Sequence, residues 1–97
     1  MSYQTEFRDF VLDVEIPEGF EDQSWHNDVC PRFDKQLPNG NWLVLWVDYL
    51  NPEDREYPKE KRFVVALFDD EYTHIETLLE SDSWQEIVDF VKGYSDA

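Results

Sequence analysis

Residues 38–47 read PNGNWLVLWV, and this stretch decides how the chain folds. Asn-Gly is the dipeptide most typical of a tight β-hairpin turn, because both residues tolerate a positive φ angle. The apolar run behind it predicts a strand that extends to about residue 50 and is covered on both faces. One face would carry Trp42, Val44 and Trp46, and the other Leu43, Leu45, Val47 and Tyr49.

Four other segments are typical of strands. VCPRFDKQL, residues 29–37, is predicted to be the first arm of the hairpin. RFVVALF, residues 62–68, and YTHIETLL, residues 72–79, are predicted to be two further strands. An extended segment is also expected over residues 10–16, where apolar residues alternate with acids, after a loose or briefly helical start.

Alternation in the strand over residues 72–79 predicts which side chains share a face. His74, Glu76 and Leu78 are expected opposite Thr73, Ile75, Thr77 and Leu79. The chain is expected to turn just before this strand, at Asp69-Asp70-Glu71.

The pattern changes to a helical period near the C-terminal end of the sequence. Trp84, Ile87, Val88, Val91 and Tyr94 fall on one face of a helix predicted over about residues 83–93. Ser83 and Glu86 form a capping-box pattern, in which each side chain bonds to the backbone N–H of the other residue. Gly93 is a typical end signal.

The order of these elements predicts an α+β fold. Residues 1–97 would form a single domain, with an antiparallel meander sheet of about four to five strands. The one C-terminal helix would pack on a face of that sheet. Trp42, Trp46 and Trp84 are all expected in its core.

Acidity is the strongest feature of the composition. The chain has 23 Asp and Glu residues against 8 Lys and Arg, a formal net charge of −15, yet 16% of it is aromatic. Disordered acidic tails are poor in aromatic residues, so the chain is expected to fold. Such a charge repels nucleic acids and anionic membranes and attracts basic proteins. No long apolar run or basic-then-apolar leader pattern occurs, which predicts a soluble, cytoplasmic protein.

The acids are concentrated toward the two ends of the chain. Residues 69–97 hold nine acids and one base, Lys92. Carboxylates at alternate strand positions repeat every roughly 6.6 Å, close to the ~6.8 Å rise of two nucleotides on one strand. A surface of this kind could occupy a phosphate-binding groove. The candidate binding residues are Asp69, Asp70, Glu71, Glu76, Glu80, Asp82, Glu86 and Asp89. Solubility or adaptation to salt is the alternative explanation.

The stretch WHNDVCPRF, residues 25–33, gathers residue types that could bind a metal. His26, Asp28 and Cys30 share one face if the stretch is extended, and His74 could supply a fourth ligand. The spacing matches no zinc-finger pattern, however, and no metal or other cofactor is predicted. The favoured interpretation is a structural loop in which Trp25 and Phe33 fill the core and Cys30 is buried.

No catalytic site is predicted. A nucleophilic Cys30 would need a nearby base and a lowered pKa, and its acidic surroundings raise the pKa of a thiol. The paired carboxylates lack a predicted cleft, and no phosphate-binding glycine loop or nucleophile elbow occurs. The sequence therefore favours a protein that is not an enzyme.

Four stretches together resemble a known group of bacterial proteins. They read GFEDQSWHNDVCPRF, WLVLWVDYLNPEDREYP, RFVVALF and LLESDSWQEIVDFV, and they span residues 17–92. The chain resembles small, acidic, uncharacterised proteins of plasmids and phage-like elements. The group has no established activity, so the resemblance implies mobile-element biology and assigns no residue a role. In size and charge alone, the chain is similar to DNA-mimic proteins that inhibit CRISPR or restriction systems.

Three hypotheses follow from the sequence. The first is a non-enzymatic inhibitor or regulator whose acidic face mimics nucleic acid and blocks a basic, nucleic-acid-binding protein. The second is a structural protein with incidental acidity that forms a homodimer through an aromatic sheet face. The third is a small metal-binding domain at residues 26–30 and His74.

Overall fold

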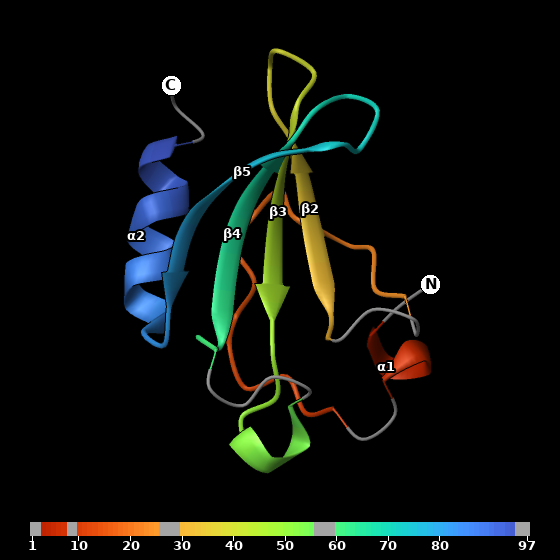
Figure 1. Ribbon diagram of the computed structural model, residues 1–97, viewed down its shortest axis with the longest axis vertical. Coiled ribbons are helices and arrows are strands. Elements are labelled where there is room, and N and C mark those ends of the chain that lie inside the picture. The colour runs from red at the N-terminus through yellow and green to blue at the C-terminus, as the bar shows by residue number, and fades with distance from the viewer. Residues whose placement is uncertain (1–2, 8–9, 26–29, 56–59, 95–97) are drawn as a thin grey trace.

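The computed structural model describes residues 3–7, 10–25, 30–55 and 60–94, and its α+β fold confirms the predicted class (Figure 1). Five strands form one antiparallel sheet in the order β1-β2-β3-β4-β5. They are β1 (Glu21–Asp22), β2 (Arg32–Gln36), β3 (Trp42–Val47), β4 (Phe63–Phe68) and β5 (His74–Ser81). The helical elements are α1 (Tyr3–Glu6), the short 3-10 helix η1 (Pro52–Asp54) and α2 (Trp84–Tyr94).

The β2–β3 hairpin forms as the sequence predicts. Gly40 has a φ angle of 92°, and the Leu37 N–H donates to the Asn41 carbonyl at 2.8 Å to close the turn. The register pairs Gln36 with Trp42 and continues to Arg32 with Trp46. Because β3 is the middle strand, Leu43, Val44, Leu45 and Val47 have no exposed surface at all.

The hydrophobic core lies on one face of the sheet. Its strand residues are Phe33, Leu37, Leu43, Leu45, Val47, Phe63, Val65 and Leu67. Helix α2 covers part of this face with Ile87 and Val91, and the N-terminal segment covers the rest with Phe7 and Phe10. In Figure 1 that segment passes behind the sheet, so the viewer sees the opposite face, which we call the open face.

The strand expected over residues 10–16 does not form. This segment crosses the core face of the sheet, with Leu12, Val14 and Ile16 packed against the core. The outer edge of β2 is instead paired with the two-residue strand β1. An ion pair between Asp13 and Arg62 fastens the segment to the residue before β4. Side-chain packing thus holds this segment in place.

Strand β5 departs from the predicted alternation. The register is irregular between Val65 and Ala66 and again between Leu67 and Phe68. As a result His74, Thr77 and Glu80 pair with open-face residues of β4, whereas Glu76 and Leu79 pair with core-face residues. The prediction that His74 and Glu76 share a face is therefore wrong, because inserted residues reverse the alternation.

Helix α2 begins and ends close to the predicted limits. The Ser83 hydroxyl accepts a hydrogen bond from the Glu86 N–H at 3.4 Å, as expected for the first half of a capping box. The Glu86 carboxylate, however, accepts from the Ser81 hydroxyl at 2.9 Å, and that hydroxyl in turn accepts from the Ser83 N–H at 3.0 Å. Gly93 lies inside the helix and does not end it. Among the described residues, no helix has the length and apolarity needed to span a bilayer.

Candidate functional site

The predicted acidic residues follow one continuous part of the chain, which runs from the β2 side of the sheet across to α2 on the opposite side. They follow the β4–β5 turn, strand β5, which is the last strand of the sheet, and the start of α2 (Figure 1). We call this surface the acidic edge. Its exposed members are Asp70, Glu71, Glu76, Glu80, Asp82, Glu86 and Asp89.

The acidic edge is continuous in sequence but does not form one regular row. The two irregularities in β5 place Glu76 on the core side of the strand and Glu80 on the open side. The regular carboxylate spacing expected from strand alternation is therefore not present. What the edge offers a partner is its summed negative charge, spread over the length of β5 and the first turns of α2.

Some carboxylates of this region stabilise the fold. Asp69 accepts hydrogen bonds from the backbone N–H groups of Glu71 and Thr73, each at 2.9 Å, and so holds the β4–β5 turn. Asp82 accepts from the Arg62 N–H at 2.8 Å and lies 3.5 Å from the Lys61 ammonium. The Arg62 N–H bond is the main reason that the pKa of Asp82 lies below its ordinary value. Asp69 and Asp82 are thus structural residues first.

Four other members have no such structural role. The side chains of Asp70, Glu71, Glu76 and Glu80 are exposed, and they form no hydrogen bond or ion pair with the described residues. At the start of α2, Glu86 bonds to Ser81, and Asp89 accepts from the Gln85 amide at 2.9 Å. The four acids of β5 and its turn are therefore the ones most available to a partner.

Three carboxylates elsewhere in the chain are buried or paired with an arginine. Asp34 is fully buried and accepts two hydrogen bonds from the Arg32 guanidinium, at 3.0 and 2.8 Å. Asp13 pairs with the buried Arg62, and the hydrogen bond from that guanidinium lowers the pKa of Asp13. Asp48 is buried and accepts from the Tyr49 N–H at 2.8 Å. Arg32 and Arg62 thus direct their guanidinium groups to carboxylates away from the acidic edge.

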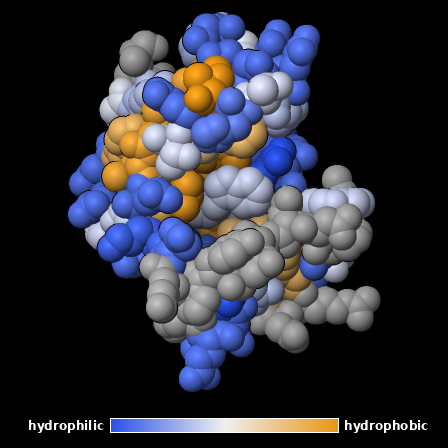
Figure 2. All heavy atoms as spheres, viewed as in Figure 1, coloured by the Kyte–Doolittle hydropathy of each residue, from blue (hydrophilic) through white to orange (hydrophobic). Residues whose placement is uncertain are grey.

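The open face carries a second feature, which the sequence analysis missed. Trp42 and Trp46, expected in the core, lie here and are partly exposed, because α2 and the N-terminal segment cover only the other face. Figure 2 shows apolar side chains gathered on this face within a hydrophilic border. Trp84 is the one of the three tryptophans that packs against the core, through Phe63 at a ring distance of 4.9 Å.

Four side chains of the open face stack one against the next, and we call them the aromatic ladder. Their order in space is Trp42, Tyr72, Arg32, Trp46. The Trp42 and Tyr72 rings stack at 5.0 Å with an interplanar angle of 21°. The Arg32 guanidinium lies 5.4 Å from the Tyr72 ring and 5.7 Å from the Trp46 ring. Because Asp34 holds this guanidinium at two points, Arg32 is fixed between the two aromatic rings.

Tyr72 reaches the ladder through an uncommon backbone conformation. Its φ angle of 63° is in the left-handed region, which costs a residue with a Cβ about 1 kcal/mol or more. The phenol is 42% exposed. Partial burial, followed by the charge of Asp34, raises the pKa of Tyr72 above its ordinary value. A strained aromatic residue on an exposed face is a recognised mark of a functional surface, and strain of this kind cannot be read from sequence.

The structure places Cys30 and His74, the two metal-ligand candidates that it describes, toward opposite ends of the sheet. Cys30 is buried beside Pro31, whose carbonyl accepts from the Val47 N–H at one end of β3. His74 pairs with Phe68, which pairs with Trp42 at the opposite end of that strand. The His74 ring packs on Phe68 and bonds to the Thr77 hydroxyl at 3.2 Å. His26 and Asp28 lie outside the described residues, and those that are described contain no metal-binding cluster.

The stretch that contains these candidates is only partly as expected. Phe33 and Cys30 are each 3% exposed, in agreement with a structural loop. Trp25 is 40% exposed, so the prediction that it fills the core is wrong. It lies beyond the short β1 strand and does not belong to the core cluster of the described residues.

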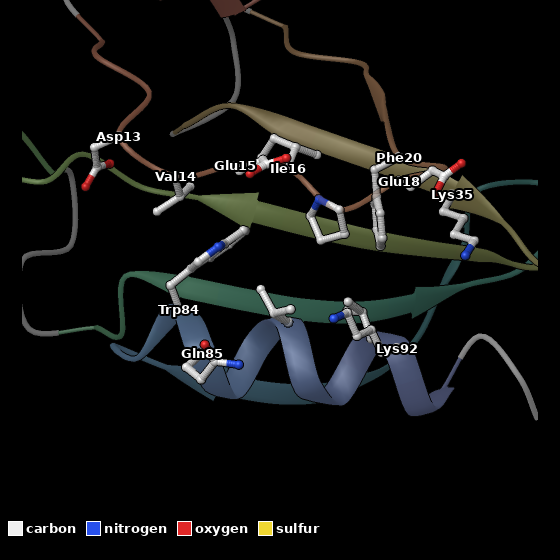
Figure 3. A pocket seen from close by; sticks show the side chains of 13 residues that line it. Asp13, Val14, Glu15, Ile16, Glu18, Phe20, Lys35, Trp84, Gln85 and Lys92 are labelled. Carbon is white, nitrogen blue, oxygen red and sulfur yellow. The ribbon is translucent and has the colours of Figure 1, made fainter.

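A groove lies on the core side, between the N-terminal segment and α2 (Figure 3). Its volume is about 660 Å³, and Val14, Ile16, Phe20 and Trp84 supply apolar walls. Three carboxylates and the ammonium groups of Lys35 and Lys92 border it. The mixture of charges favours no one class of ligand.

No protein-family model matches this chain, and neither a curated protein nor a solved structure is significantly similar to it. The resemblance to proteins of mobile elements therefore stays a prediction. The acidic edge and the open face are the two surfaces from which a function can be inferred.

Proposed function

We propose that this protein is a non-enzymatic, cytoplasmic inhibitor or regulator that binds a basic, nucleic-acid-binding protein through its acidic edge. The edge would occupy the positive groove that otherwise holds a phosphate backbone, so that the partner can no longer bind nucleic acid. Inhibition of a host defence system, the role of DNA-mimic proteins of similar size and charge, is the setting that we favour.

One observation carries the proposal. Two arginines of the described chain neutralise carboxylates away from the acidic edge, in the Arg32–Asp34 and Arg62–Asp13 pairs. Asp70, Glu71, Glu76 and Glu80 are left exposed without ionic partners among the described residues. Other exposed acids, such as those of residues 15, 18, 53 and 54, also lack ionic partners among the described residues, but they lie on separate segments, whereas these four follow one strand and the turn before it.

The physics of such an interface predicts how it responds to salt. Exposed charges interact over a Debye length of roughly 8 Å at physiological ionic strength and about 3 Å in 1 M salt. An interface made mainly of exposed carboxylates and a partner's lysines and arginines therefore associates fast at low salt and weakens as salt is added.

The test is capture of partners from a lysate of the native host, with two matched variants. The edge variant combines Asp70→Asn, Glu71→Gln, Glu76→Gln and Glu80→Gln, and leaves the structural Asp69 and Asp82 unchanged. The control variant combines Glu15→Gln, Glu18→Gln, Glu53→Gln and Asp54→Asn, which are exposed acids away from the edge. Both variants lose four negative charges, so a difference between them reports the position of the charge and not its amount.

We expect the wild type and the control variant to capture a basic nucleic-acid-binding protein at low salt, and the edge variant to lose it. Competing duplex DNA should displace the captured protein, because both ligands use the same groove. Equal capture by the edge and control variants, or binding that is unchanged between low and high salt, would show that the acidic edge is not the binding surface.

A further inference from the structure

The open face brings aromatic, aliphatic and acidic side chains into one cross-strand row. The register pairs Arg32 with Trp46, Trp46 with Val64, and Val64 with Glu80, so these four residues lie side by side on β2, β3, β4 and β5. Adjacent strands are about 4.8 Å apart, which places Glu80 roughly 10 Å from Trp46 across the sheet. The row therefore leads from the aromatic ladder directly to the acidic edge.

The ladder itself shows which group its rings accept. Arg32 approaches Trp46 from the β2 side, and its guanidinium lies over the ring at 5.7 Å. On the other side of Trp46 the row continues over Val64, which is partly exposed, to the exposed carboxylate of Glu80. The aromatic ring and the carboxylate can each bind the guanidinium of an arginine side chain. The aliphatic surface between them can pack against the apolar stem of that side chain.

The charge around the open face favours a cationic occupant. Glu21 pairs with Asp34 on this face, and Asp70 and Glu71 lie at the turn beside Tyr72. Among the described open-face strand residues, Arg32 is the only lysine or arginine, and Asp34 already holds its guanidinium. A second copy of the chain fits poorly, because it would bring another net charge of −15 against this surface.

We propose that an arginine side chain of the basic partner docks on the row formed by Trp46, Val64 and Glu80. Its guanidinium binds Glu80 or the ring of Trp46, and its stem lies over Val64. This inference rests on the proposed function and specifies it, because it assigns the partner's key residue type. The acidic edge then supplies attraction at long range, and the open face supplies the short-range contact that distinguishes arginine from lysine.

The test uses two defined probes, nona-arginine and nona-lysine peptides, which carry the same charge. Their affinities for the full chain are measured by titration calorimetry at several salt concentrations. We expect both peptides to bind and to weaken with salt, and nona-arginine to bind roughly two- to fivefold more tightly at each concentration. In ¹⁵N spectra of the wild type, the indole N–H signal of Trp46 should shift with nona-arginine, and that of Trp84 should not.

Two substitutions test whether the preference for arginine over lysine arises at Trp46. Trp46→Leu keeps an apolar side chain in the row but removes the ring, so it should abolish the preference for arginine and leave nona-lysine binding unchanged. Tyr94→Leu is the matched control, because it removes an aromatic ring from α2 on the other side of the sheet and should leave the preference intact. The spectra of the wild type give the result independently, should Trp46→Leu disturb the fold.

The outcomes separate the two proposals. If both peptides bind with equal affinity, or if Trp46→Leu keeps the preference, the arginine site is wrong and the acidic-edge proposal stands. If neither peptide binds at low salt, both proposals are wrong. Concentration-dependent dimerisation that Trp46→Leu abolishes would show that a second copy occupies the open face, which also overturns the inference.

Discussion

Asp13 and Arg62 lie 49 positions apart in the sequence, and a two-point ion pair joins their side chains. The guanidinium is buried, packs 4.7 Å from the Phe63 ring centroid, and also donates to the Asp48 carbonyl at 3.0 Å. One arginine thus connects the N-terminal segment, the end of β3 and the start of β4.

Replacing Asp13 should destabilise the protein through the arginine that it leaves unpaired. We expect Asp13→Asn to lower the free energy of unfolding by about 2 kcal/mol, less than for a fully buried pair because the Asp13 side chain is 31% exposed. Urea unfolding followed by tryptophan fluorescence measures this change. Glu15→Gln, an exposed acid of the same segment, should change it by less than about 0.5 kcal/mol. Equal effects of the two substitutions would contradict the role of the pair.

Acid pH should weaken the same contacts. The pKa values of Asp13 and Asp82 both lie below the ordinary carboxyl value, through hydrogen bonds from the Arg62 side chain and the Arg62 N–H respectively. A lowered pKa stabilises the folded state above the unfolded-state pKa, and this stabilisation is lost as the pH falls through the folded-state pKa.

The measurable quantity is the difference in unfolding free energy between the wild type and an Asp13→Asn, Asp82→Asn double variant. It should be constant above about pH 5 and shrink below about pH 4. The difference is used because falling pH also relieves repulsion among the other acids in both proteins. A difference that grows toward low pH would contradict the assigned directions of the two pKa values.

Tyr72 allows backbone strain to be separated from stacking. Tyr72→Ala removes the stack on Trp42 but keeps a Cβ at a φ of 63°, whereas Tyr72→Gly removes both. We therefore expect the glycine variant to be about 1 kcal/mol more stable than the alanine variant, although both are less stable than the wild type. Thermal unfolding measures the order. At Asp70, which has no positive φ, alanine should be at least as stable as glycine.

Asp69 and Asp70 are adjacent acids that should behave differently. Asp69→Ala removes the acceptor of two backbone hydrogen bonds in the β4–β5 turn and should cost about 1–2 kcal/mol. Asp70→Ala changes an exposed side chain and should cost less than about 0.5 kcal/mol. Chemical denaturation compares the two. Hydrogen exchange at the Thr73 amide should accelerate in the first variant alone, and matching exchange rates would rule out the turn-holding role of Asp69.

Local sequence signals predict the fold well where one segment determines its own structure. The Asn39-Gly40 turn, the alternating faces of β3 and the start of α2 at Ser83 all form as expected. Each depends on a turn conformation, a period or a cap that lies within a few residues. The meander order follows, because antiparallel strands joined by short turns pair with their neighbours.

The remaining features depend on tertiary contacts that no local pattern contains. The irregular register opposite Ala66 reverses the faces of β5, and the N-terminal segment packs on the core through side chains without pairing as a strand. Trp42 and Trp46 have core-like character, yet α2 and the N-terminal segment cover only the other face of the sheet. The predicted acids follow one continuous stretch of chain from the β4–β5 turn to α2. Sequence alone cannot separate those that hold a turn, such as Asp69, from those that remain exposed, such as Glu80.

The position of β5 as the last strand has a consequence for self-association. An outermost strand presents unpaired backbone donors and acceptors on which a strand from another molecule can add, and long runs of such pairing produce fibres. The carboxylates of Glu76 and Glu80 and the irregular register of β5 oppose that pairing. We propose above that these acids attract a basic partner. The same acids therefore also keep copies of the chain apart. At concentrations far above those of the capture experiment, a variant that neutralises them should self-associate more readily than the wild type.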